Sequence, residues 1–105
     1  MEKITLTNKA PEFTITGHEE KMSAEILKVS LQEPTSQNLK LNVTDENGLL
    51  IYSKLLIPET EHPNTVLGSE YPEVAVNKRI IFSAFIKISI EAPAGNPFSV
   101  EVYYV

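Results

Sequence analysis

Residues 80–91 read IIFSAFIKISIE and residues 98–105 read FSVEVYYV, and these two stretches decide the fold. Every even-numbered position in both is apolar, and most odd-numbered positions of the first are polar. A period of two residues is typical of a β-strand that buries one face. The breaker run APAGNP at 92–97 separates the stretches, so the pattern predicts an antiparallel C-terminal hairpin.

Short alternating stretches upstream of this hairpin predict further strands. They lie at residues 3–7, 12–16, 22–32, 38–44 and 49–57, with a short strand around Val74 and Val76. Residues 58–73 show no clear periodicity and contain three prolines and a glycine. A connection of this length is typically a functional loop or a crossover between sheets.

Residues 16–32 allow two interpretations. Thr16 and Glu19 have the spacing of a helix capping box, which favours a helix. Apolar residues at positions 27, 29 and 31 alternate strictly with polar ones, which favours a strand. We favour a turn at 17–21 followed by a strand. Because the apolar parity changes near Ile26, we expect a β-bulge there.

The sequence DENG at 45–48 predicts a type I turn followed by a glycine in the left-handed conformation. In the register that this turn sets, Val43 opposes Ile51 and Leu39 opposes Leu55. The strand after the turn carries apolar residues on both of its faces. Such a strand is either central in a sheet, covered on both sides, or part of an interface.

Seven or eight short strands with a long connection predict an all-β fold. We expect an antiparallel two-sheet β-sandwich, of immunoglobulin-like or jelly-roll topology. The Cys and Trp residues that mark antibody-type domains are absent, so both topologies stay open. A chain of 105 residues is long enough for one core and too short for two, which predicts a single domain over residues 1–105.

Composition and charge exclude several kinds of partner. Fourteen acidic and nine basic residues give a net charge of −5, and no cluster of Lys and Arg occurs. Binding to a phosphate backbone depends on such clusters, so we expect no nucleic-acid partner. The longest apolar run is far shorter than the roughly 20 residues of a membrane helix, so we expect no membrane partner. The N-terminus lacks a signal-peptide pattern, which predicts synthesis in the cytoplasm.

No residue pattern indicates catalysis, a metal site or a cofactor, so we expect a protein that is not an enzyme and binds no cofactor. The chain has no cysteine and only two histidines, His18 and His62. His18 is next to Glu19 in a polar turn. Glu61 and His62 are adjacent on an irregular loop, which is not a known spacing of metal ligands. A solvated loop explains both histidines better than a site does.

The sequence contains more apolar residues than one sandwich core obviously needs. If the C-terminal hairpin pairs Ile88 with Val100, then Phe85 opposes Tyr103 on the face away from the core. The alternative, that the domain covers these residues itself or that the register differs, stays open. The predicted protein interface consists of Ile81, Phe85, Tyr103, Val105, Leu50 and Tyr52.

Three segments resemble the small all-β accessory proteins of tailed-phage virions and prophage structural clusters. They are VTDENGLLIY at 43–52, YPEVAVN at 71–77 and AGNPFSVEVYY at 94–104. The resemblance implies a non-enzymatic role in capsid decoration or in tail or fibre assembly, and a place in the virion. It also implies that the protein forms homo-oligomers and contacts a larger protein assembly.

A second hypothesis is a carbohydrate- or protein-binding module that uses the loop at 58–73. In this hypothesis Tyr71 is a platform on which a ligand stacks, and the carboxylates of the loop accept hydrogen bonds. The candidate loop residues are Glu59, Glu61, His62, Glu70 and Tyr71. Loops commonly carry binding residues on a rigid scaffold, which favours this location.

Overall fold

The alternating stretches fold as β-strands. A computed structural model of the chain describes residues 1–19, 21–32, 38–56, 73–93 and 97–105, and these residues contain eight strands and no helix. The strands are β1 (Glu2–Thr7), β2 (Glu12–Thr16), β3 (Ser23–Leu31), β4 (Lys40–Thr44), β5 (Leu50–Leu55), β6 (Glu73–Ile81), β7 (Phe85–Glu91) and β8 (Ser99–Tyr104).

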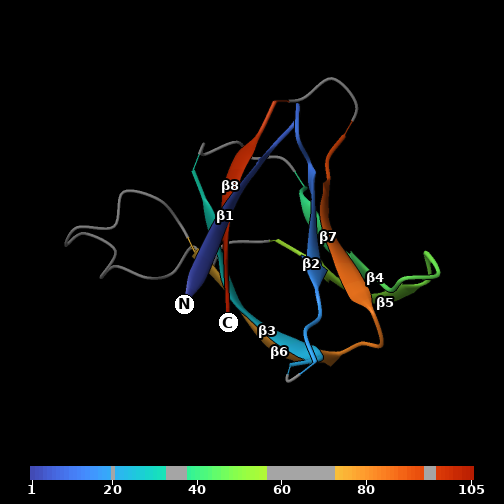
Figure 1. Ribbon diagram of the computed structural model, residues 1–105. Coiled ribbons are helices and arrows are strands. Elements are labelled where there is room, and N and C mark those ends of the chain that lie inside the picture. The colour runs from blue at the N-terminus through green and yellow to red at the C-terminus, as the bar shows by residue number, and fades with distance from the viewer. Residues whose placement is uncertain (20, 33–37, 57–72, 94–96) are drawn as a thin grey trace.

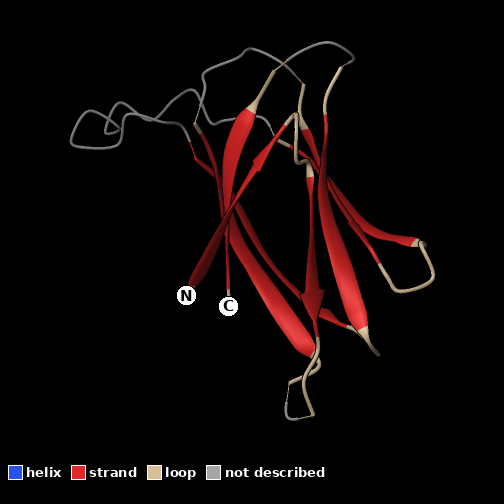
Figure 2. Cartoon of the chain, turned by 45° about the horizontal axis from the view of Figure 1, so that its top comes forward, coloured by secondary structure: helices blue, strands red, loops and turns tan. Residues whose placement is uncertain are grey.

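The strands form two antiparallel sheets of four, which lie as two layers (Figure 1 and Figure 2). Sheet A has the order β1-β8-β3-β6, and sheet B has the order β2-β7-β4-β5. β1 pairs with β8, β2 with β7, β3 with β6 and β4 with β5, so the chain is one ribbon of nested pairs. Two further pairs, β3–β8 and β4–β7, join the nested pairs into the two sheets.

This strand order identifies the topology as a jelly roll. The predicted all-β sandwich of two antiparallel sheets is therefore confirmed. Of the two topologies expected from the sequence, the immunoglobulin-like one is not found, because β8 lies between β1 and β3.

The core lies between the two sheets and collects alternate residues from each strand. Ile86 and Ile88 of β7 and Val100 and Val102 of β8 belong to this core, and all four are fully buried. Burial of one such side chain contributes about 1.5–3 kcal/mol to stability. The buried apolar residues are Leu6, Ala24, Ile26, Val29, Leu31, Leu39, Leu41, Val43, Leu56, Val74, Ile80, Phe82, Ile86, Ile88, Ile90, Phe98, Val100 and Val102.

The predicted C-terminal hairpin is wrong, and residues 80–91 do not form one strand. β6 ends at Ile81, a bend follows, and β7 begins at Phe85. β7 pairs with β2 and β4 in sheet B, whereas β8 pairs with β1 and β3 in sheet A. Phe82, within the bend, is buried in the core that both sheets share. The alternation of apolar residues therefore continues from β6 through the bend into β7, and it does not reveal that the chain crosses from sheet A to sheet B there.

The β-bulge predicted near Ile26 is confirmed. The pairing of β3 with both neighbours shifts between Ile26 and Lys28, and Leu27 is the extra residue against β8. The apolar residues before and after this shift are buried in the same core. The bulge therefore brings the even-numbered apolar residues before it and the odd-numbered apolar residues after it onto the same face of β3. The helix interpretation of residues 16–32 is wrong.

The turn predicted at 45–48 is confirmed, but the predicted register of its hairpin is wrong. Gly48 has a φ of 79°, and its N–H donates a hydrogen bond of 3.0 Å to the Asp45 carbonyl. The register shifts between Val43 and Thr44, so Val43 pairs with Tyr52. Ile51, which the sequence pattern placed opposite Val43, is the extra residue of β5 at this shift.

Two further strands differ from expectation in place or length. Among the described strands, β5 has β4 as its one neighbour and lies at the edge of sheet B, so the strand that is apolar on both faces is not central. β6 is longer than the short strand predicted around Val74 and Val76, because it continues to Ile81. Most of the predicted connection at 58–73 lies outside the described residues.

Candidate functional site

The six residues predicted to form one interface lie on both sheets of the sandwich. Ile81, Tyr103 and Val105 belong to strands of sheet A or directly follow one, whereas Leu50, Tyr52 and Phe85 belong to sheet B. Phe85 pairs with Thr16 and not with Tyr103. No single face of one chain therefore carries all six residues, although a role of each in an interface stays a prediction.

Tyr52 and Phe85 are less available to a partner than the sequence pattern predicts. Tyr52 is half-buried and packs against the core, and the Lys78 Nζ atom lies 5.6 Å from the centre of its ring. Phe85 is also half-buried. Both aromatic rings therefore contribute part of their surface to the packing of the domain itself.

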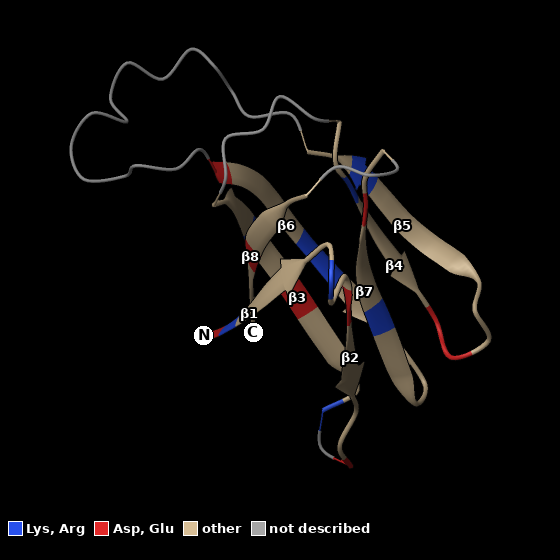
Figure 3. Ribbon diagram, turned by 90° about the horizontal axis from the view of Figure 1, so that it is seen from above, with Lys and Arg blue, Asp and Glu red and all other residues tan. Residues whose placement is uncertain are grey.

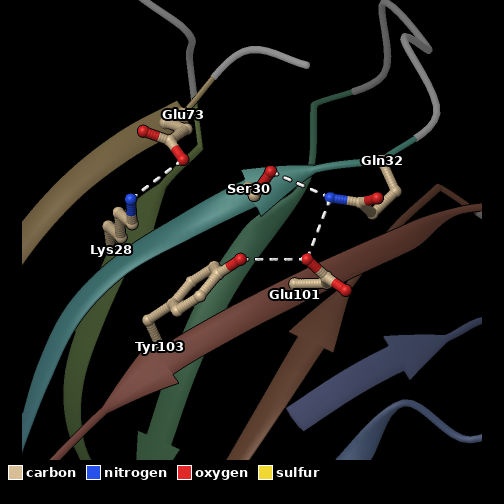
Figure 4. Close-up of polar contacts among 6 residues, drawn as sticks. All are labelled: Lys28, Ser30, Gln32, Glu73, Glu101 and Tyr103. Atoms are coloured by element: carbon tan, nitrogen blue, oxygen red, sulfur yellow. Dashed lines mark hydrogen bonds and ion pairs between the residues drawn. The ribbon is translucent and has the colours of Figure 1, made fainter. Parts of the chain in front are cut away.

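Tyr103 lies in a polar network on the outer face of sheet A (Figure 4). The Lys28 Nζ atom is 4.9 Å from the centre of its ring and 3.0 Å from Glu73 Oε2. The Tyr103 hydroxyl donates a hydrogen bond of 3.1 Å to Glu101 Oε1. The ring and the hydroxyl of Tyr103 are thus both engaged within the chain.

The same network covers Ser30, the one polar residue that is buried within the described residues. Gln32 Nε2 donates to Ser30 Oγ at 2.9 Å and to Glu101 Oε1 at 3.3 Å. Lys3 Nζ lies 3.3 Å from Glu101 Oε2. The network links all four strands of sheet A and pairs its charges internally, so we assign it a structural role.

Four of the seven exposed large apolar residues in the described part of the chain lie along β5. Leu49, Leu50, Ile51 and Leu55 are each 40% to 64% exposed, and we call these four residues the β5 patch. Of the four, only Leu50 was predicted from the sequence. The pattern of apolar residues on both parities of this strand was the signal for the other three, but the bulge at Ile51 was not foreseeable from it.

Charges of opposite sign lie at the two ends of the β5 patch. Figure 3 shows β5 without charge along most of its length, with acidic residues in the preceding turn and lysine at the far end. The acidic residues are Asp45 and Glu46. At the other end lie Lys54 and Lys40, the latter paired with Leu55 across the two strands. The patch is therefore an apolar strip between one acidic and one basic end.

The residues of the second hypothesis cannot be placed. Glu59, Glu61, His62, Glu70 and Tyr71 all lie outside the described residues. His18, the other histidine, is exposed and exchanges backbone hydrogen bonds of 2.9 Å with Lys21 in a tight turn. A structural role in this turn is sufficient to explain its position.

Within the described ranges, no three residues of the types that bind metals come together as a potential site. These ranges also contain no helix that could span a membrane. No protein-family model and no curated protein matches the chain. The candidate site therefore rests on the geometry of the β5 patch.

Proposed function

We propose that the protein is a non-enzymatic structural protein that assembles with copies of itself through the β5 patch, as a component of a larger assembly such as a virion. The exposed apolar edge of β5 carries this proposal. Natural proteins commonly protect an edge strand with charges, prolines or a covering segment, because its backbone groups can pair with another chain. β5 has Lys54 as its only charged residue and contains no proline.

A second copy of the chain fits this edge because the charges around it are complementary under a two-fold axis. When two β5 strands lie antiparallel, the first residue of one strand is beside the last residue of the other. Asp45 and Glu46 of one copy then approach Lys40 and Lys54 of the second. The apolar side chains between these ends pack against each other and leave water.

The proposed place in a virion has separate support. The jelly-roll architecture includes capsid domains. The resemblance of residues 43–52, 71–77 and 94–104 to phage accessory proteins is an expectation from the sequence that agrees with this role. One fold serves many functions, so the fold supports the virion role without determining it. Self-assembly through β5 is the part of the proposal that the purified protein can test directly.

Light scattering after size-exclusion chromatography, over a concentration series, tests the assembly. One chain has a mass of 11.7 kDa, and we expect the wild-type mass to rise toward twice this value with concentration. Leu55→Lys places a second charge in β5 and should keep the protein at the mass of one chain. Ile81→Lys is the matched control, because Ile81 is 78% exposed at the end of an edge strand in the other sheet.

Two results would contradict this proposal. A wild-type protein that keeps the mass of one chain at the highest concentration excludes self-assembly. Dissociation by Ile81→Lys together with no effect of Leu55→Lys would place the interface on sheet A instead. Circular dichroism spectra of both variants establish that a change in mass does not come from unfolding.

A further inference from the structure

A cleft opens between the two sheets on the side away from β5. β1 and β2 meet at a corner, where Thr7 and Ala10 exchange backbone hydrogen bonds of 3.0 and 3.2 Å. From this corner β1 continues in sheet A and β2 in sheet B, and the two strands separate (Figure 1). The cleft has a volume of about 390 Å³. This volume lies toward the small end of ligand sites, which hold about 300–1,000 Å³.

Partly exposed aromatic rings line this cleft. The rings of Phe13 in β2 and Tyr104 in β8 have centres 5.9 Å apart and are tilted by 46°. Both residues are half-buried, whereas Phe82 and Ala24, which also line the cleft, are buried. The rings therefore have apolar surface that the domain does not cover completely, on a support that the core holds in place.

Burial, and then the nearby Glu2 carboxylate, raise the pKa of the Tyr104 phenol above its usual value of about 10. At neutral pH the hydroxyl carries its proton, as a tyrosine phenol ordinarily does, and can donate a hydrogen bond.

The remaining lining of the cleft is mostly polar, with Ile15 and Val105 as its apolar members. Thr14, Thr16 and Ser23 contribute hydroxyl groups. Glu2 and Lys21 carry opposite charges, and the imidazole of His18 also lines the cleft. β2 has β7 as its described neighbour, so the backbone groups of its other edge also face this side. The cleft thus offers several hydrogen-bond donors and acceptors without a strong net charge.

We infer that this cleft binds a neutral sugar ring. A pyranose has C–H groups that can contact the rings of Phe13 and Tyr104, and hydroxyl groups that can bond to the polar lining. A wholly apolar ligand would leave the lining hydroxyl and carboxylate groups without partners, which costs affinity. The opposite charges of Glu2 and Lys21 give a charged ligand no net electrostatic advantage over a neutral one. β2 and β5 lie at opposite edges of sheet B, so this site is independent of the proposed assembly surface.

Amide chemical shifts of the ¹⁵N-labelled protein test this inference. The probes are methyl glucoside, methyl mannoside, methyl galactoside and N-acetylglucosamine, with glucosamine and glucuronate as charged counterparts. We expect at least one neutral sugar to move the amide signals of residues 13–16 and Tyr104 in a saturable way. The charged counterparts should bind more weakly than their neutral relatives.

Variants on the two faces of β8 locate the site. Tyr104→Leu removes a ring and a hydroxyl from the cleft and should weaken binding about tenfold, which corresponds to about 1.4 kcal/mol. Tyr103→Leu is the matched control, because Tyr103 is the preceding residue and lies in the network on the outer face (Figure 4). Thr14→Trp changes an exposed residue of the lining and should block the cleft without disturbing the core.

Three results would overturn the inference. The first is that no neutral sugar moves the β2 signals at concentrations well above the millimolar range. The second is that a charged counterpart alone binds. The third is that Tyr103→Leu weakens binding as much as Tyr104→Leu does, or that Thr14→Trp leaves it unchanged while its spectrum shows a folded protein.

Discussion

Asp45 and Gly48 fix the turn between β4 and β5 by different means. The Asp45 Oδ1 atom accepts hydrogen bonds of 2.9 Å from the backbone N–H groups of Asn47 and Leu49. Gly48 adopts a φ of 79°, which a residue with a Cβ atom reaches only at a cost. The side chain of one residue and the missing side chain of the other therefore position the start of the β5 patch.

Replacing Gly48 with Ala should destabilise the protein by about 1 kcal/mol through the backbone conformation alone. A Cβ atom at this position would meet no atom within 4 Å, so steric contact adds nothing. Gly48→Asn should cost less, because Asn tolerates the left-handed region better. Urea unfolding of the three proteins measures both differences. Equal stability of Gly48→Ala and wild type would mean that the turn changes its conformation at no cost.

Tyr104 should make stability fall at alkaline pH. Its pKa is raised in the folded protein, so above about pH 10 the unfolded chain loses the phenol proton before the folded one does. The folded state then binds more protons, and the free energy of unfolding decreases as the pH rises through the folded pKa. Below about pH 10 the contribution is fully present. Urea unfolding of wild type and Tyr104→Phe between about pH 9 and pH 11 should show a steeper decrease for wild type. The same decrease of stability with pH in both proteins would contradict a raised pKa of Tyr104.

At the scale of the strands, local patterns predicted most of the strands and the pairing of β4 with β5, but not the partners that are distant in the sequence. β2 was predicted with its observed bounds, and the bulge of β3 followed from the change of parity at Ile26. Both depend on neighbouring residues in the sequence. The partners of β7 are β2 and β4, which are distant in the sequence, and no local pattern encodes this choice.

The candidate site was predictable only in part, for the same reason. The apolar character of β5 is visible in the sequence, and Leu50 was identified from it. Tyr103 has the same apolar appearance, but its contacts with Lys28 and Glu101 depend on the pairing of β3 with β8. Without that pairing, a residue held in an internal network cannot be distinguished from one that is available to a partner.

Engineered cysteine pairs can distinguish the observed pairing from the C-terminal hairpin. Lys87 pairs with Thr14 in the structure, whereas the hairpin places Lys87 opposite Glu101. The chain has no cysteine of its own, so an intramolecular disulfide can form only between the two engineered cysteines. We expect the double variant Thr14→Cys with Lys87→Cys to form a disulfide on mild oxidation, because paired strand positions are close enough for one. Lys87→Cys with Glu101→Cys should stay reduced while folded, and mass spectrometry after alkylation separates these outcomes.

At the scale of the whole molecule, β8 has a greater role than its length of six residues indicates. It lies inside sheet A, between β1 and β3, and forms hydrogen bonds with both. Val100 and Val102 are fully buried, and Phe98, just before the strand, is nearly so. β1, at the edge of the same sheet, has one fully buried residue, Leu6.

Removal of residues 98–105 should therefore abolish cooperative unfolding. The three buried side chains alone contribute about 1.5–3 kcal/mol each, which is comparable to the stability of about 5–15 kcal/mol of a typical domain. Removal of residues 1–7 should lower the melting temperature but preserve a cooperative transition. Thermal unfolding followed by circular dichroism compares the two deletions. A cooperative transition in the protein without residues 98–105 would show that β8 is dispensable.

The nested pairing of the strands also determines when the protein can fold during its synthesis. β1 leaves the ribosome first among the described strands and has to wait for β8, which leaves last, before it has a neighbour in its sheet. β2 waits similarly for β7, so only β4 and β5 can pair soon after they emerge. Through most of translation the apolar faces of the nascent chain have no partner, and such chains are prone to aggregate. A cell that makes this protein rapidly therefore has to keep neighbouring nascent chains apart until β8 has left the ribosome.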